Sequence, residues 1–90
     1  MGKRLAVLVR ERQEEALRVA VGLTLGDNRV EVFILDRKLA PTAASSAFLE
    51  ALRDLETPVA TTCADNEGIE LVSNAELARR IVACDHVLAY

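Results

Sequence analysis

One cysteine carries most of the chemical interest of this 90-residue chain. Cys63 ends the run PVATTC, which is apolar and β-branched, and opens the polar stretch ADNEG. A thiol in that position can act as a nucleophile through its thiolate, or it can fill a small buried space as free cysteines often do. Asp65 and Glu67 follow closely, and their negative charge disfavours a thiolate. Both interpretations of Cys63 therefore stay open at this point.

The other groups that could do chemistry give weaker signals. Cys84, Asp85 and His86 are possible metal ligands, but neighbours of this kind rarely close a site without a second pair elsewhere. We therefore expect no metal, with Cys84 packed at a helix end and His86 starting a strand. The chain has neither GxGxxG nor GxxxxGK[ST], so we also expect no nucleotide cofactor. A general acid and base could come from several carboxylates, which the sequence alone does not pair: Asp54, Glu56, Asp65, Glu67 and Glu70.

Composition narrows the class of partner. The formal net charge is −3, and the chain has two Phe, one Tyr and no Trp. A nucleic-acid binder needs clustered basic residues and, for single strands, aromatic stacking platforms, so we expect no nucleic-acid partner. The longest apolar run near the start is too short for a signal peptide or a membrane span. We expect a cytoplasmic protein with reduced thiols and no membrane partner.

The elements that must position Cys63 follow from hydrophobic periodicity. Residues 4–9 form a continuous apolar run, as in a strand covered on both faces. The stretch 11–28 predicts a helix that ends at the turn 26–28, and residues 29–36 predict a second strand. The helix should bury one broad face and use Gly22 for close packing on the sheet. The residues of that face recur at helical spacing: Ala16, Leu17, Ala20, Val21, Leu23 and Leu25.

The second half repeats this alternation. Residues 37–46 predict a loop, 47–56 a helix with Phe48, Leu52 and Leu55 on one face, and 58–63 a short strand that ends in Cys63. The stretch 68–73 fits either a strand or an extended connector. Ser73 and Glu76 match a capping box, in which each side chain bonds the backbone of the other. The helix they start should bury one side and lead into a final strand at 86–90, with the buried side made of Leu77, Ala78, Ile81 and Val82.

Strands alternating with helices predict one domain over residues 1–90. Its fold class is α/β, a three-layer α/β/α arrangement with a mostly parallel sheet of four to five strands. Chemistry in such sheets collects at the carboxyl ends of the strands. Cys63 falls at that edge, and Cys84 falls nearer the opposite one.

The chain resembles the DsrE/DsrF/DsrH-like sulfur-relay family, which includes the Tus-type sulfur carriers. The resemblance lies in three stretches: LAVLVRERQEEALRVAVGLTLGDNRVEVFILD, VATTCADNEGI and ACDHVLAY. It implies a DsrE-like fold, assembly into homo-oligomers or with related subunits, and persulfide carriage on the strand-end cysteine. Cys63 is the only position that inherits this role. Family members tend to carry basic residues after that cysteine, whereas residues 64–67 here are acidic and polar.

We therefore expect a small sulfur-relay protein, a possible sulfurtransferase or persulfide carrier. Cys63 would take sulfane sulfur from a donor protein and pass it to an acceptor protein without a cofactor. The alternative is a non-catalytic binding or assembly module with the same fold, in which Cys63 serves packing. A receiver-type regulatory domain fits less well, because Arg10, Glu11 and Arg12 replace the acidic pair that would bind Mg²⁺ after the first strand.

Overall fold

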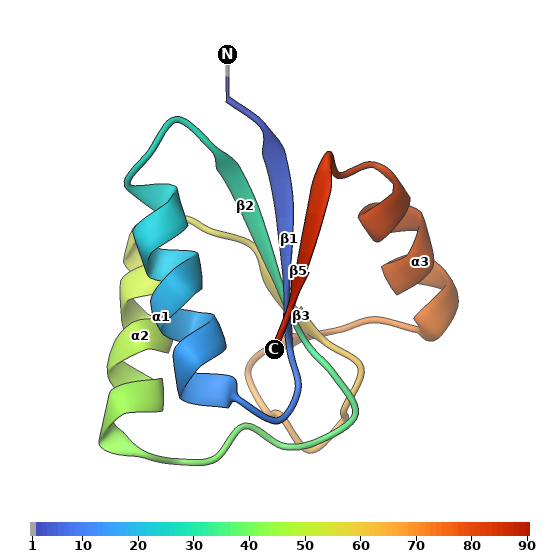
Figure 1. Ribbon diagram of the computed structural model, residues 1–90. Coiled ribbons are helices and arrows are strands. Elements are labelled where there is room, and N and C mark those ends of the chain that lie inside the picture. The colour runs from blue at the N-terminus through green and yellow to red at the C-terminus, as the bar shows by residue number, and fades with distance from the viewer. Residues whose placement is uncertain (1) are drawn as a thin grey trace.

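The computed structural model describes residues 2–90 as a parallel sheet between two layers of helix (Figure 1). The chain alternates strands and helices, except that two strands follow one another before the last helix. The strands are β1 (Arg4–Val9), β2 (Arg29–Ile34), β3 (Val59–Thr61), β4 (Glu70–Leu71) and β5 (His86–Ala89). The helices are α1 (Gln13–Thr24), α2 (Ala43–Asp54) and α3 (Asn74–Val82).

The strand order is β4-β3-β2-β1-β5, and every neighbouring pair is parallel. α1 and α2 cover one face of the sheet, and α3 covers the other (Figure 1). This confirms the three-layer α/β/α fold class and its parallel sheet. In residues 2–90, no helix combines the length and the apolar character that a bilayer crossing requires.

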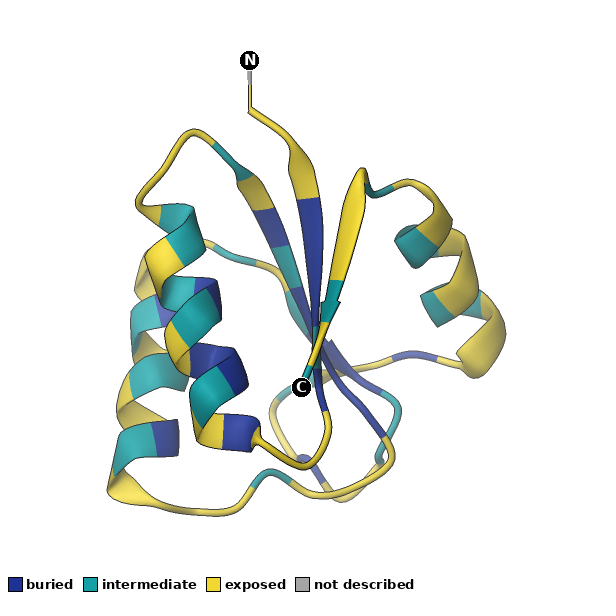
Figure 2. Ribbon diagram, viewed as in Figure 1, coloured by how far each residue is buried: buried dark blue, intermediate teal, exposed yellow. Residues whose placement is uncertain are grey.

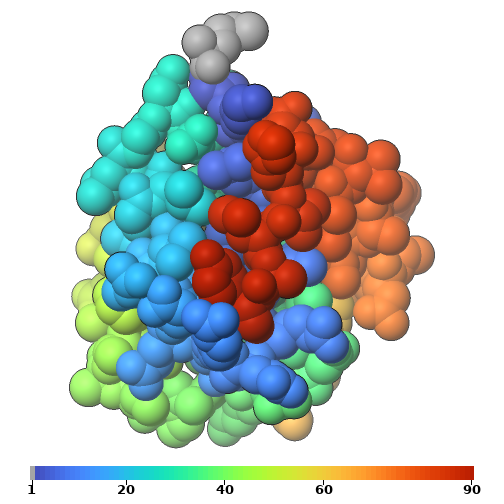
Figure 3. Space-filling view, in the orientation of Figure 1, coloured from blue at the N-terminus to red at the C-terminus, as the bar shows by residue number. Residues whose placement is uncertain are grey.

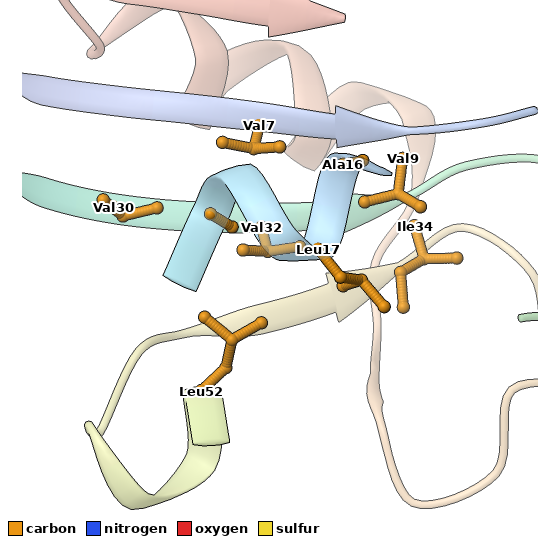
Figure 4. Packing of buried hydrophobic residues seen from close by; sticks show 9 residues of the cluster. Val7, Val9, Ala16, Leu17, Val30, Val32, Ile34 and Leu52 are labelled. Carbon is orange, nitrogen blue, oxygen red and sulfur yellow. The ribbon is translucent and has the colours of Figure 1, made fainter. Parts of the chain in front are cut away.

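Alternation along the strands sends side chains to two separate core layers. The larger layer lies under α1 and α2 and contains Val7, Val32, Ile34, Leu17 and Leu52, all fully buried (Figure 4). The second layer lies under α3 and is built around Ala6, Phe33 and Ala60. Because β1 and β2 have apolar residues at consecutive positions, both faces of these two strands can be buried, as expected for central parallel strands.

The α3 side of the molecule is the more open one. Most of α3 and β5 is exposed, whereas the central strands are buried (Figure 2). Only Leu77 and Ile81 of α3 pack on the second core layer. The expectation that Ala78 and Val82 share this buried side is wrong, since Ala78 is exposed and Val82 is 84% exposed. The shorter α3 turns only one narrow stripe toward the sheet.

Several predicted element boundaries also need correction. Residues 43–46, expected in a loop, form the first turn of α2, because the Thr42 hydroxyl accepts a hydrogen bond from the Ser45 N–H and caps the helix. α1 ends at Thr24, which leaves Leu25 76% exposed instead of on the buried face. α2 ends at Asp54, and Leu55 beyond it is likewise exposed.

The ends of the strands differ as well. β2 stops at Ile34, and at Asp36 the backbone turns into the left-handed region with a φ of 68°. β3 stops at Thr61, so Cys63 lies two residues beyond the strand. At α3, Ser73 does cap the helix by accepting from the Glu76 N–H. Glu76 does not complete the predicted capping box, because its carboxylate pairs with Arg79 and Arg80.

Gly22 has no packing role on the sheet, contrary to expectation. A Cβ at this position would meet no atom within 4 Å, and the residue is exposed within α1. Because glycine in a helix costs about 0.5–1 kcal/mol relative to alanine, Gly22→Ala should raise the free energy of unfolding by about that amount. Urea unfolding of the purified protein measures this change.

Gly68→Ala is the matched control for that measurement. Gly68 has a φ of +77°, a conformation that side-chain-bearing residues rarely adopt. The same substitution should therefore lower stability at this position. Destabilisation by Gly22→Ala would contradict the assignment of Gly22 as a helix position without packing constraints.

Arg80 of α3 bonds three carboxylates, two of which lie on the sheet. Its guanidinium lies 2.8 Å from Glu70 of β4, 2.9 Å from Glu76 of α3 and 3.4 Å from Glu31 of β2. These hydrogen bonds lower the pKa of Glu70 and of Glu76 below the ordinary value of 4.5. The bonds to Glu70 and then Glu76 also raise the pKa of Arg80.

The network predicts a specific acid sensitivity. A carboxyl group whose pKa is lowered in the folded state contributes stability above its unfolded pKa, and this contribution is lost as the pH falls through the folded value. Arg80→Met should therefore flatten the fall in unfolding free energy between about pH 5 and pH 3. Urea unfolding at a series of pH values measures the slope. Arg10→Met, which removes an exposed arginine at the other edge, should keep the wild-type slope, and equal slopes in all three proteins would contradict the prediction.

Candidate functional site

Cys63 lies at the carboxyl edge of the sheet, where two loops meet. The loop after β2 (35–42) and the loop after β3 (62–69) run beside each other at the bottom of Figure 1. This edge is where open parallel sheets place their ligands and catalytic groups. The position predicted from strand order therefore agrees with the structure.

Asn66 is the residue that joins these two loops. It is 7% exposed, and its amide group makes three hydrogen bonds. The Leu39 N–H donates to Asn66 Oδ1 at 2.7 Å, while Asn66 Nδ2 donates to the Arg37 carbonyl at 3.1 Å and to Thr61 Oγ1 at 2.9 Å. A buried amide with all these partners fixes the loop in one conformation, because breaking any bond leaves a buried polar group without a partner.

The same network holds the backbone of Cys63 on both sides. The Cys63 N–H donates to Thr61 Oγ1 at 3.1 Å, and the Cys63 carbonyl accepts from the Asn66 N–H at 3.1 Å. Thr61 Oγ1 in turn donates to the Ile34 carbonyl at 2.7 Å, which anchors it to β2. The thiol is thus carried on a short, tightly bonded turn that starts directly at the end of a buried strand.

Side-chain hydrogen bonds from two further residues, Thr62 and Gln13, hold the neighbouring loop. The Asp36 N–H donates to Thr62 Oγ1 at 3.0 Å, at the point where the backbone turns into the left-handed region. Gln13, at the start of α1, is buried, accepts from the Ala40 N–H at 2.9 Å and donates to the Lys38 carbonyl at 3.2 Å. The first turn of α1 and the end of β3 therefore both fix the 35–42 loop.

The acids that follow Cys63 line a hollow at this edge of the sheet. Asp65 and Glu67 are exposed and line a hollow of about 290 Å³ next to α2, together with Lys38 and Leu49. Cys63 is half-buried and does not line that hollow. The two carboxylates share this hollow with a lysine, and Asp65 remains only two residues from Cys63, so their negative charge still disfavours a thiolate there.

Across residues 2–90, no hydrogen bond joins the Cys63 thiol to a lysine, arginine or histidine side chain. The amino end of α3, considered from the sequence as a source of positive potential, is capped by its own Ser73.

Cys84 and His86 lie at the opposite edge of the sheet and do not join Cys63. The Cys84 thiol donates to the Arg80 carbonyl at 3.5 Å and packs against the second core layer, as expected for a helix-end residue. Burial, and to a lesser degree the charge of Glu31, raises the pKa of the Cys84 thiol. In the part of the chain that the structure describes, no three His, Cys, Asp or Glu side chains gather as metal ligands would.

The sequence did not reveal that the side chains of Thr61, Asn66 and Gln13 hold these loops through hydrogen bonds. A polar residue in a loop or at a helix start usually indicates solvent exposure, and nothing in their spacing marks them as buried. One signal for this role is the position of Thr61, directly after a buried strand residue and five residues before Asn66. At that spacing the Thr61 hydroxyl can accept hydrogen bonds from both the Cys63 N–H and the Asn66 side chain.

A solved structure with this arrangement matches the chain over its whole length. The crystal structure of the ychN protein from E. coli superposes with a TM-score of 0.78 at 20% sequence identity, and the match covers 100% of each chain. The chain has the ychN fold. Neither a family model nor a curated protein sequence matches the chain. At this level of identity the likeness to ychN shows the fold alone.

Proposed function

We propose that this protein is a sulfur carrier that holds sulfane sulfur as a persulfide on Cys63. The observation that carries the proposal is the placement of Cys63, on a turn fixed by Thr61 and Asn66 at the carboxyl edge of the sheet. The residues around the cysteine resemble the DsrE/DsrF/DsrH-like family, and the ychN fold is of the DsrEF-like type. The sequence resemblance supports this chemistry, and the fold is compatible with it.

The chemistry needs a thiolate and a donor persulfide. The Cys63 thiolate attacks the outer sulfur of a donor persulfide, R–S–SH. The S–S bond of the donor breaks, R–S⁻ leaves, and Cys63–S–SH forms. In the second step an acceptor thiolate attacks the outer sulfur of Cys63–S–SH, which regenerates the Cys63 thiolate. Neither step changes the total number of electrons, so no external oxidant or reductant is required.

The fixed turn explains how the chain assists these steps. Thiol–disulfide type exchange requires the attacking sulfur, the attacked sulfur and the leaving sulfur to align, and a rigid turn limits the orientations of the Cys63 side chain. The partner protein is expected to supply the positive charge that stabilises the thiolate, since the chain supplies none through a hydrogen bond in residues 2–90. We propose donor and acceptor proteins with basic surfaces around their reactive cysteines.

Mass spectrometry of the intact protein tests the proposal. After incubation with a low-molecular-weight persulfide and removal of excess reagent, the wild type should gain the mass of one sulfur atom, and a reducing thiol should remove it. Cys63→Ser should gain none, and Cys84→Ser, the matched control, should gain as much as the wild type. No gain in the wild type, or an equal gain in Cys63→Ser, contradicts the proposal.

An assembly role is the second candidate, and the open α3 side favours it. Three large apolar residues are exposed around that face or its edges: Leu71 on β4, Val82 on α3 and Val87 on β5. β5 lies at the surface between α1 and α3 (Figure 3). We propose that this side packs against another copy or a related subunit, as the family resemblance implies. Light scattering across a concentration series measures the mass in solution, and a monomer at all concentrations contradicts this part.

A further inference from the structure

β5 forms one edge of the sheet, and the helices lie over the inner strands instead. α1 packs on β1 and β2, and α3 packs on a core layer built from residues of β1, β2 and β3. Three of the four residues of β5 are exposed. Figure 3 shows this strand at the surface between α1 and α3. The outer side of β5 is therefore accessible to another strand.

Every second residue of β5 turns its backbone groups outward. The Tyr90 N–H donates to the Leu8 carbonyl at 3.0 Å, and the Tyr90 carbonyl accepts from the Arg10 N–H at 3.0 Å, so Tyr90 faces β1. A strand bonds its parallel neighbour through alternate residues, so Val87 and Ala89 face away from β1. Their N–H and C=O groups have no hydrogen-bond partner among residues 2–90.

The side chains of β5 leave this edge unprotected. Edge strands usually avoid pairing with other chains by being very short or by carrying charged residues or proline. β4, at the other edge, has two residues, and one of them is Glu70, which bonds Arg80 at 2.8 Å. Residues 86–89 contain no Lys, Arg, Asp, Glu or Pro, and Val87 is 42% exposed. β5 therefore lacks the features that prevent strand pairing, whereas β4 has two of them.

A second copy of β5 fits this edge about a twofold axis at Leu88. In an antiparallel pair centred there, Val87 lies opposite the partner subunit's Ala89, and the outward N–H and C=O groups of both residues bond each other. The register pairs Val87 with Ala6, so this large–small contact lies on the α3 face. The two Leu88 side chains meet on the opposite face. No like charges face each other within the pair, because the strand carries none at neutral pH.

We propose that β5 pairs antiparallel with β5 of a second copy and joins the two sheets into one. A twofold contact of this kind closes on itself, whereas a parallel copy would leave a new open edge. The proposal rests on the assembly role proposed above and names the contact that performs it. The interface is small, as in weak and reversible complexes, so the dimer should dissociate on dilution. It leaves the Cys63 turn free, because β2 and β1 separate β3 from β5.

A concentration series followed by ¹⁵N NMR and light scattering tests the pairing. As the mass rises toward that of a dimer, the amide resonances of Val87 and Ala89 should shift. The amides of His86 and Leu88 point toward β1 in either state and should shift less. A dimer in which the Val87 and Ala89 resonances stay unmoved overturns this inference and leaves the assembly role standing. A monomer at all concentrations overturns both.

Two lysine variants separate strand pairing from packing through the α3 face. Val87→Lys places a charge on the edge strand and should weaken dimerisation about tenfold or more. Val82→Lys is the matched control, because it places the same charge on an exposed apolar position of α3 and should dimerise like the wild type. Equal or greater weakening in Val82→Lys overturns the pairing in favour of packing through α3. Both positions are exposed, and circular dichroism checks that both variants are folded.

Disulfide cross-linking tests the register in a Cys63→Ser, Cys84→Ser background. Leu88→Cys places two thiols at the twofold axis, where the Cα atoms of such a pair lie about 4.5 Å apart, within the range for a disulfide. Val87→Cys places them on a diagonal of about 7–8 Å, beyond that range. Mild oxidation should therefore link Leu88→Cys much faster. Equal or faster linking of Val87→Cys, or no linking of Leu88→Cys at concentrations where it is folded and dimeric, overturns the proposal.

Discussion

Replacing Asn66 by alanine is expected to lower the free energy of unfolding by about 3 kcal/mol, because one buried and two part-buried polar groups lose their partner together. The substitution would leave the Leu39 N–H, the Arg37 carbonyl and one bond of the Thr61 hydroxyl unsatisfied. It would also release the turn that carries Cys63. Sulfur uptake by the folded variant should therefore be slower than in the wild type.

Urea unfolding and the rate of sulfur uptake are the two measurements. Asn74→Ala is the matched control, since Asn74 is exposed at the start of α3 and its side chain makes no hydrogen bond to residues 2–90. Its effect on stability should stay within about 0.5 kcal/mol. A cost for Asn66→Ala no larger than that of the control would show that the network does not hold the loop.

Asn66→Asp sharpens the same test. Aspartate has nearly the shape of asparagine, but its ionised carboxylate has no donor for the Arg37 carbonyl or for Thr61 Oγ1. It still accepts from the Leu39 N–H. If hydrogen bonding and not side-chain volume fixes the turn, this variant should also be destabilised, whereas a volume effect alone would leave it close to the wild type.

Phe33→Ala is expected to have the largest effect of any single substitution, about 3–5 kcal/mol. Phe33 is 0% exposed and is the largest fully buried side chain of the described residues. It forms the centre of the core layer under α3, which one short helix covers. A 90-residue domain has a total stability of about 5–10 kcal/mol, so this variant should lose a third or more of its stability.

Phe48→Ala provides the comparison. Phe48 lies on α2 and is half-buried at the margin of the larger core layer. Because less of its surface is buried and the layer has two helices over it, its loss should cost clearly less. Circular dichroism during urea unfolding ranks the two variants. An equal cost, or a larger cost for Phe48→Ala, would place the main core elsewhere than the structure does.

The sequence predicts the fold class well because the apolar runs of the strands are unambiguous. The run at residues 4–9 is a strand with the predicted bounds, and the alternation with helices correctly predicts that the strands are parallel. Errors occur where one hydrogen bond decides the outcome. Thr42 starts α2 earlier than the loop-forming residues around it indicate, and the competition of Arg79 and Arg80 for Glu76 prevents the full capping box.

The sequence predicts where the candidate site lies, but not the hydrogen bonds that hold it. Strand order alone places Cys63 at the carboxyl edge. The role of Asn66 depends on a bond network across residues 37–66, which periodicity does not encode. Leu25 and Val82 show the same limit for packing: both fit a helical apolar face, yet one lies beyond the end of its helix and the other lies outside the narrow stripe that α3 buries.

The pairing of β5 with β1 determines which part of the folded sheet unfolds locally most easily. The register pairs Leu5 with His86, so the contacts that hold β5 join residues about as far apart in sequence as this chain allows. Contacts of that kind form late in folding, after the loop between them has closed. β5 is also an edge strand whose residues are largely exposed. The amide protons of β5 should therefore exchange with solvent through a local opening whose free energy is well below that of global unfolding. The amide protons of β1 and β2 should exchange only when the whole domain unfolds.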